Sequence, residues 1–178
     1  MRFTPAPLAG AFIVDVERFE DARGFFARTF CEQEFAAHGM AQRPMQSNVS
    51  FNAIRGTLRG MHFQRAPHAE AKLVRCTAGK IFDVIVDVRD DSPTCYQWFG
   101  IELDSQSRRA LYIPEGFAHG FQTLTDATEV FYEMFNLFQP GYSDGLRWDD
   151  PALAIAWPLA VEAISDKDLS YPLLKTQL

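Results

Sequence analysis

Short apolar runs alternate with turn residues along most of the chain. The clearest run, 81–88, is apolar at every even position, and its odd positions combine two isoleucines with Asp83 and Asp87. A period of two with many β-branched residues is typical of a strand. Gly79 before the run and the polar stretch 90–93 after it are turn signals. We therefore predict a strand over 81–88 whose even positions face a core.

Other segments repeat this pattern at intervals of roughly 8–12 residues. They are 10–16, 25–29, 46–52, 56–63, 72–77, 97–103, 109–113, 120–124 and 128–136. Helix is scarce: 31–39 suits a short helix ending at Gly39, while 152–156 and 166–169 suit single turns. This composition of elements predicts an all-β sandwich or barrel of the jelly-roll kind. Because no linker, repeat or low-complexity tract interrupts the chain, we expect one domain over residues 1–178.

Composition and charge exclude several classes of function. The 178 residues are 47% hydrophobic and 22% charged, as in ordinary globular proteins, and the net charge of −6 disfavours a nucleic-acid binder. No apolar run approaches the ~20 residues that span a membrane. The apolar stretch 8–14 is short and is followed by charged residues, so we expect no signal peptide. Three cysteines without close pairing favour a reduced, cytoplasmic protein.

The densest group of polar residues that suit catalysis lies between positions 46 and 72. Arg59, His62, Gln64 and Lys72 fall within fourteen positions, on predicted strands rich in apolar neighbours. Buried charge is costly unless it is paired or used, so this group predicts a functional cavity. On a regular strand, His62 and Gln64 share one face and Arg59 points the other way. A bulge at Gly60 would let all three reach the same cavity.

Other chemistries fit the sequence less well. Jelly-roll metal sites often use a His-x-His pair, but here the second position is Gln64, and only His119 lies in a comparable context. Two dispersed histidines without a defined carboxylate make a poor transition-metal site, so we expect no metal. The sequence has neither a Gly-x-Ser-x-Gly elbow nor a glycine-rich phosphate loop. Phosphate would have to be bound by arginines such as Arg23, Arg55 and Arg59.

An ordered set of motifs carries a family resemblance over nearly the whole chain. The motifs lie at 21–26, 46–50, 58–64, 72–75, 79–87, 113–121, 147–151, 157–158 and 164–168. With them the chain resembles the dTDP-4-dehydrorhamnose 3,5-epimerases, a family of cupin-like sugar-nucleotide epimerases. The resemblance implies a double-stranded β-helix jelly roll, and a homodimer in which the N-terminal part contributes to the partner's site. It also implies a dTDP-linked 4-keto-6-deoxyhexose as substrate, with no cofactor and no metal.

The resemblance also assigns roles to individual residues. His62 matches the catalytic base, Asp168 the acid that pairs with it, and Lys72 the residue near the keto oxygen of the sugar. The positions that match substrate contacts are Arg23, Phe26, Gln46, Asn48, Arg59, Gln64, His119 and Phe138. These roles suit proton abstraction beside a ketone, because a lysine ammonium stabilises the enolate and a carboxylate fixes the tautomer of the histidine.

Two positions depart from the family pattern. Phe138 stands where relatives usually have a tyrosine, which we take as the acid on the face opposite the histidine, and Arg28 replaces a usual glutamate. Tyr132 matches a different tyrosine of the pattern, and Tyr142 lies in the following loop. We therefore expect an epimerase of altered scope, acting at C3 and C5 or at one of them. A 3,4-ketoisomerase and a non-catalytic sugar-nucleotide-binding barrel are the alternatives.

Overall fold

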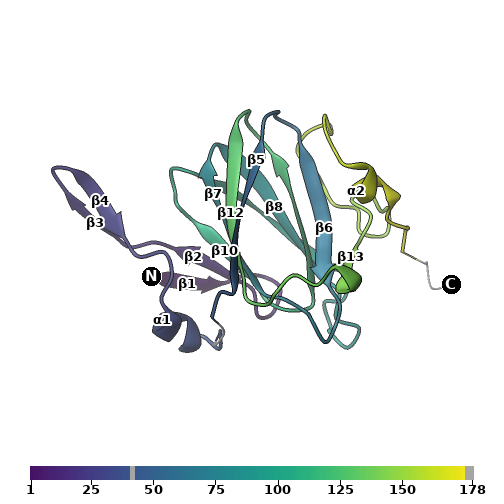
Figure 1. Cartoon of the computed structure of the whole chain (residues 1–178), viewed down its shortest axis with the longest axis horizontal. Coiled ribbons are helices and arrows are strands. Elements are labelled where there is room, and N and C mark those ends of the chain that lie inside the picture. The colour runs from purple at the N-terminus through teal and green to yellow at the C-terminus, as the bar shows by residue number, and fades with distance from the viewer. Residues whose placement is uncertain (41–42, 175–178) are drawn as a thin grey trace.

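Two antiparallel β-sheets lie face to face in the computed structural model, which describes residues 1–40 and 43–174 (Figure 1). The six-stranded sheet consists of β1 (Arg2–Pro5), β2 (Phe12–Asp15), β10 (Ala110–Ile113), β7 (Lys72–Ala78), β12 (Thr128–Met134) and β5 (Gln46–Asn52), in that order. The five-stranded sheet consists of β13 (Ser143–Gly145), β6 (Leu58–Gln64), β11 (Phe117–Thr123), β8 (Lys80–Asp87) and β9 (Trp98–Asp104). The predicted all-β architecture is confirmed.

The remaining elements are small. Strands β3 (Arg18–Asp21) and β4 (Gly24–Ala27) pair only with each other, and the helices are α1 (Glu32–Ala36), α2 (Asp166–Ser170) and the 3₁₀ turn η1 (Pro140–Tyr142). Every predicted strand overlaps an observed one. The sequence reading missed β1, β3 and β13, which are only three or four residues long and lack apolar alternation. The segment 152–156, predicted as a single turn, overlaps a hydrogen-bonded turn at 151–153 and continues without regular structure.

The core has three layers. Ile81 and Ile85 pack between the sheets, whereas Val84 and Val86 pack on the outer face of β8 against Leu153 and the C-terminal segment. The prediction that the even positions of β8 face the core is therefore incomplete, because the odd positions face the inter-sheet core. Both faces are buried because the C-terminal segment covers the outer one. A third cluster packs α1 against the outer face of the six-stranded sheet.

The β3–β4 hairpin projects from the body of the molecule on the side opposite α2 (Figure 1). Its residues are exposed almost throughout, and Phe19 and Phe26 are 66% and 71% exposed. An isolated two-stranded ribbon is at best marginally stable in water. The hairpin therefore lacks the packing that the rest of the chain provides for its strands.

Two smaller predictions concern the environment of the chain. Cys31, Cys76 and Cys95 are free thiols. Within residues 1–40 and 43–174, no helix is long and apolar enough to cross a bilayer.

Candidate active site

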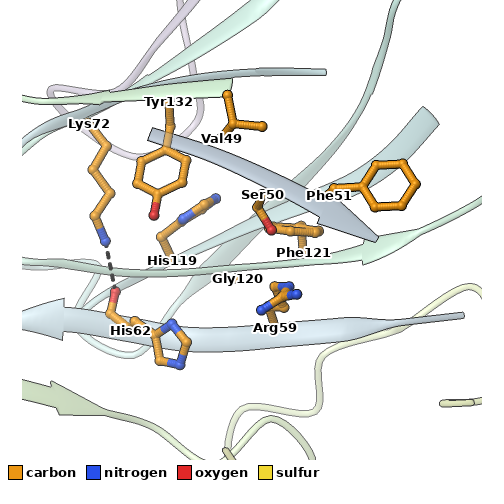
Figure 2. A pocket seen from close by; sticks show the side chains of 10 residues that line it. All are labelled: Val49, Ser50, Phe51, Arg59, His62, Lys72, His119, Gly120, Phe121 and Tyr132. Atoms are coloured by element: carbon orange, nitrogen blue, oxygen red, sulfur yellow. Dashed lines mark hydrogen bonds between the residues drawn. The ribbon is translucent and has the colours of Figure 1, made fainter. Parts of the chain in front are cut away.

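A cavity of about 370 Å³ opens between β5 and β12 of one sheet and β6 and β11 of the other (Figure 2). Its lining residues are Val49, Ser50, Phe51, Arg59, His62, Lys72, His119, Gly120, Phe121 and Tyr132. A second pocket of about 150 Å³ shares His62, Lys72 and Tyr132 with the first and adds Phe138 and other residues. These three shared side chains stand where the two lobes meet, which makes the junction the candidate reaction centre.

A bulge in β6 brings Arg59 and His62 into the same cavity. His119 pairs with His62 and Phe121 pairs with Arg59, so β6 uses one residue more than β11 over this interval. The extra residue lies next to Gly60, whose φ is +137°; a Cβ added at this position would stand 2.5 Å from Gly120 Cα. Only glycine fits this backbone and this close approach. The bulge predicted at Gly60 is confirmed.

His62 is oriented by Asp168 of α2. His62 Nε2 lies 2.7 Å from Asp168 Oδ1, and the Gly60 N–H donates to Asp168 Oδ2 at 3.1 Å. Burial of Asp168 opposes its ionised form, but the hydrogen bonds from His62 and Gly60 outweigh that cost and lower the pKa of this carboxyl. An ionised carboxylate accepts hydrogen bonds only, so Nε2 carries the hydrogen and the Nδ1 lone pair is free. The structure thus brings together a histidine and a carboxylate that lie 106 positions apart.

Lys72 approaches the junction from β7. Its ammonium donates to the main-chain oxygen of His62 at 3.3 Å and forms an ion pair with Glu70 at 3.1 Å. Figure 2 shows the Lys72 ammonium and the Tyr132 hydroxyl both directed toward β6. A cation therefore lies on the same side of the cavity as His62, where it can stabilise a negative charge on a ligand.

Tyr132 enters the cavity from β12, on the wall opposite β6. Burial raises the pKa of this phenol, Arg59 lowers it and Glu70 raises it, with a net rise. The hydroxyl thus keeps its proton near neutrality. The structure thus places a phenol at position 132 in the cavity, whereas the sequence analysis expected the phenolic acid at position 138.

Buried polar partners hold two further cavity residues, Arg59 and His119. Arg59 Nε donates to the Asn52 side chain at 2.7 Å, which leaves the other guanidinium donors for a ligand. His119 Nε2 lies 2.8 Å from Asp83 Oδ1, and Asp83 is fully buried. The sequence reading missed the roles of Asn52 and Asp83. The only sign of these roles in the sequence is that Asp83 lies on the face of β8 that carries Ile81 and Ile85.

Gln64 and Gln46 hold the segment that carries Phe138. The Gln64 amide donates to the His68 and Leu137 carbonyls and accepts from the Gln139 N–H. Gln46 accepts from the Phe138 N–H at 2.7 Å. Gln64 was predicted to contact substrate; it lines the second lobe, but its hydrogen-bonding groups serve the 137–139 loop. Phe138 is half exposed at the rim of that lobe.

Four predicted contact residues lie outside the linings of the two lobes: Gln46, described above, and Asn48, Arg23 and Phe26. Asn48 is half-buried in β5 and pairs with Tyr132. Arg23 is 90% exposed at the tip of the β3–β4 hairpin and pairs with Asp21, and Phe26 is also on that hairpin. Within one chain, therefore, the structure does not bring Arg23 and Phe26 to the cavity.

The described residues contain no group of three or more His, Cys, Asp or Glu side chains arranged to hold a metal ion. Both carboxylates that reach the cavity histidines, Asp168 and Asp83, lie on separate elements and each serves one histidine. The arrangement is suited to acid–base chemistry by paired side chains.

The profile of the family dTDP-4-dehydrorhamnose 3,5-epimerase matches residues 5–176. The chain belongs to this family. The epimerase of Methanothermobacter thermautotrophicus is 44% identical over 98% of this chain and 95% of its own length. The dTDP-6-deoxy-D-glucose-3,5-epimerase of Legionella pneumophila, solved in complex with dTDP-4-keto-L-rhamnose, superposes with a TM-score of 0.90 at 35% identity, covering 97% of this chain and 92% of the other.

A third member of the epimerase family bears on Tyr132. The 3'-monoepimerase from Streptomyces bikiniensis, solved with dTDP as a double variant, superposes with a TM-score of 0.88 at 32% identity, covering 95% of this chain and 85% of the other. Its two substitutions, histidine to asparagine and tyrosine to phenylalanine, are 70 positions apart, the same separation as His62 and Tyr132. The comparison supports the pairing of these two residues at the junction, and the jelly-roll prediction is confirmed by the structural matches.

Proposed function

We propose that this chain epimerises a dTDP-linked 4-keto-6-deoxyhexose at C3 and C5, using His62 as the base. The observation that carries the proposal is the convergence of His62, Lys72 and Tyr132 at the junction of the two lobes. The substrate class is that named for the relatives, one of which was solved with dTDP-4-keto-L-rhamnose. The Arg59 guanidinium and His119 at the wall of the larger lobe suit the diphosphate.

The reaction begins with the free Nδ1 of His62. This nitrogen takes the hydrogen from a carbon next to the ketone as a proton, and the C–H electron pair passes through the new C=C bond to the keto oxygen. The Asp168 carboxylate stabilises the imidazolium that forms. The Lys72 ammonium stabilises the enolate oxygen, because its charge is fixed in a cavity where little water can compete.

Reprotonation from the other side completes the inversion. Tyr132 lies on the wall opposite β6, and its phenol donates a proton to the face of the enolate that His62 does not address. The C–H bond is thereby restored with inverted configuration, the imidazolium releases its proton to water and the phenolate regains one. A solvent hydrogen is consequently incorporated at each epimerised carbon.

The test is incubation of the pure protein with dTDP-4-keto-6-deoxyglucose in deuterated water, followed by NMR. We expect deuterium at C3 and C5 and the L-lyxo product, with His62→Asn reducing both by at least about 10². Exchange in the His62→Asn variant at the wild-type rate would assign the base to another residue. No exchange in the wild type would refute the proposed activity and favour a non-catalytic binding barrel.

A single-centre epimerase is the second candidate function. It is favoured by Phe138 at the rim of the second lobe and by the monoepimerase among the relatives. Deuterium at only one carbon identifies this activity, and Phe138→Tyr then tests whether the hydroxyl restores the second exchange. Transfer of the ketone between C3 and C4 would instead identify the ketoisomerase alternative by the position of the carbonyl in the product.

We also propose that the active form is a homodimer in which the β3–β4 hairpin packs on the partner. The exposed Phe19 and Phe26 of the projecting hairpin support this arrangement, as do Val49 and Phe51, which are 60% and 59% exposed on the edge strand β5. In such a dimer Arg23 and Phe26 reach the partner's cavity. The free thiols favour a reducing compartment, and we propose the cytoplasm.

Mixed dimers test this assembly. Arg23→Ala and His62→Asn each inactivate a different half of a shared site, so refolding the two variants together should restore activity that neither shows alone. Light scattering measures the oligomeric state. A monomer with full activity, or mixed variants that stay inactive although they form dimers, would refute the shared site.

A further inference from the structure

Glu70 is a buried carboxylate at the junction, outside the residues that the mechanism uses. It lies two residues before Lys72, its side chain is 3% exposed, and it lines the second lobe. Oε1 forms the ion pair with the Lys72 ammonium. Within residues 1–40 and 43–174, Oε2 is buried without a hydrogen-bond partner. A carboxylate in this position is costly, and its role needs an explanation.

Stability is a poor explanation for this ion pair. The desolvation of two buried charges roughly cancels their attraction, and an apolar pair of similar volume is often as stable. The Glu70–Lys72 pair is almost completely removed from water, with the lysine side chain 9% exposed. The pair lies at the junction and not in one of the three apolar clusters. This location indicates that the pair serves the reaction.

Glu70 restricts where the Lys72 ammonium can lie. The ammonium is held between the Glu70 carboxylate and the His62 main-chain oxygen, on the side of the cavity that carries His62. An ammonium has three donors, so at least one remains for a ligand. A flexible four-carbon side chain is thereby fixed at one point, where a donor aimed at a developing negative charge is most effective.

Glu70 also balances the charges that face Lys72. The ionisable groups around the ammonium, from every element that lines the two lobes, are His62 and Arg59 on β6, His119 on β11, Tyr132 on β12, Lys167 on α2 and Glu70 itself. Asp168 and Asp83 are already hydrogen-bonded to His62 and His119. Glu70 is therefore the anion in direct contact with Lys72.

We propose that Glu70 is the positioning residue for Lys72: it fixes the ammonium at the junction while the enolate forms. The inference rests on the proposed epimerase function and deepens it. Glu70 acts through Lys72 and does not itself exchange a proton with the sugar. Its charge and its reach contribute separately, since the first attracts the ammonium and the second sets the point at which the ammonium lies.

Two variants separate these contributions. Glu70→Gln keeps the shape but removes the charge, and Glu70→Asp keeps the charge but draws it back by one methylene. The matched control is Glu102→Gln, which removes the same charge from the exposed Lys80–Glu102 pair on strands β8 and β9. For each protein, kcat and KM for dTDP-4-keto-6-deoxyglucose are measured at one pH, together with the melting temperature.

We expect Glu70→Gln to lower kcat by about 10-fold to 100-fold with little change in KM. Glu70→Asp should also lower kcat with little change in KM, because the shorter side chain draws the ammonium away from its place at the junction. Glu102→Gln should match the wild type throughout.

A Glu70→Gln protein with the wild-type kcat would overturn the inference, as would a lower melting temperature with unchanged kcat and KM. If Glu70→Gln does not fold, Glu70→Asp decides alone, and a wild-type kcat in that variant counts against positioning. A wild type that exchanges no deuterium refutes the proposed function. A wild type that exchanges normally while the Glu70 variants behave like Glu102→Gln refutes this inference alone.

Discussion

Asp168→Asn replaces one carboxylate oxygen beside His62 with an NH₂ group. Two donors now face this side chain, the Gly60 N–H at 3.1 Å and His62 Nε2 at 2.7 Å. An asparagine has only one acceptor oxygen, and the buried Gly60 N–H has the stronger need for it. The NH₂ group then faces Nε2, so the hydrogen of the ring moves to Nδ1. The nitrogen that faces the cavity can no longer accept a proton.

The expected loss follows from the cost of restoring the active tautomer. Rotating the amide back leaves the Gly60 N–H without an acceptor and loses the charge-assisted bond to His62, which together cost roughly 3–5 kcal/mol. This corresponds to a fall in kcat of about 10²–10⁴. Deuterium incorporation at C3 and C5 measures the rate, and calorimetric titration with dTDP measures binding, which should stay within about threefold. A folded Asp168→Asn protein that keeps more than a tenth of the wild-type rate would refute the tautomer argument.

The same substitution predicts a pH dependence of stability. The pKa of Asp168 is lower in the folded chain than its ordinary value, so its ionised contacts stabilise the fold above that ordinary value and are lost as the pH falls through the folded pKa. Asp168→Asn should therefore destabilise the protein at neutral pH and less so in acid. Urea unfolding at about pH 7 and about pH 3 measures both differences. An equal difference at both values would contradict the assignment.

Three further predictions concern other elements. Tyr132→Phe should slow inversion by about 10² or more, while His62 still exchanges deuterium with retained configuration. NMR distinguishes the two products, and undiminished inversion would exclude Tyr132 as the acid. Gly60→Ala should cost about 3 kcal/mol or more in urea unfolding, because of its φ and the contact with Gly120; a loss below about 1 kcal/mol would contradict that geometry. Burial opposes the ionisation of Asp87, but hydrogen bonds led by those from Arg89 hold its pKa far below its usual range. Asp87→Asn should therefore lower the free energy of unfolding by about 2–4 kcal/mol near neutrality and by progressively less below about pH 4. Melting temperatures measured against pH would show this.

Position 138 illustrates what the sequence predicts about the site and what it leaves undecided. The sequence correctly indicates an aromatic residue near the site, and the structure places Phe138 at the rim of the second lobe. It did not reveal which tyrosine faces His62. That depends on the register between β12 and its neighbours, which sets whether Tyr132 or an adjacent residue points between the sheets.

Pairs of buried groups were the least predictable part of the site. Asp83 and His119 are 36 positions apart, and Asn52 and Arg59 meet through side chains on neighbouring edges of two sheets. Which side chains become partners depends on how the two sheets stack, and no local sequence pattern predicts that stacking. Glu70, by contrast, lies two residues before Lys72 in the sequence. The importance of this ion pair depends on its burial, which a position in a loop does not reveal.

The sequence by itself determined the strands, the bulge at Gly60 and the residue types able to move a proton, because these depend on local periodicity and on the steric limits of single residues. The tertiary structure alone decided which side chains meet. It placed Asp168 behind His62, Tyr132 across from it and the β3–β4 hairpin away from its own cavity. The physical reason is that pairing register and sheet stacking are fixed by contacts between distant segments, and a one-residue change in register would turn His62 or Tyr132 to the opposite face of its strand.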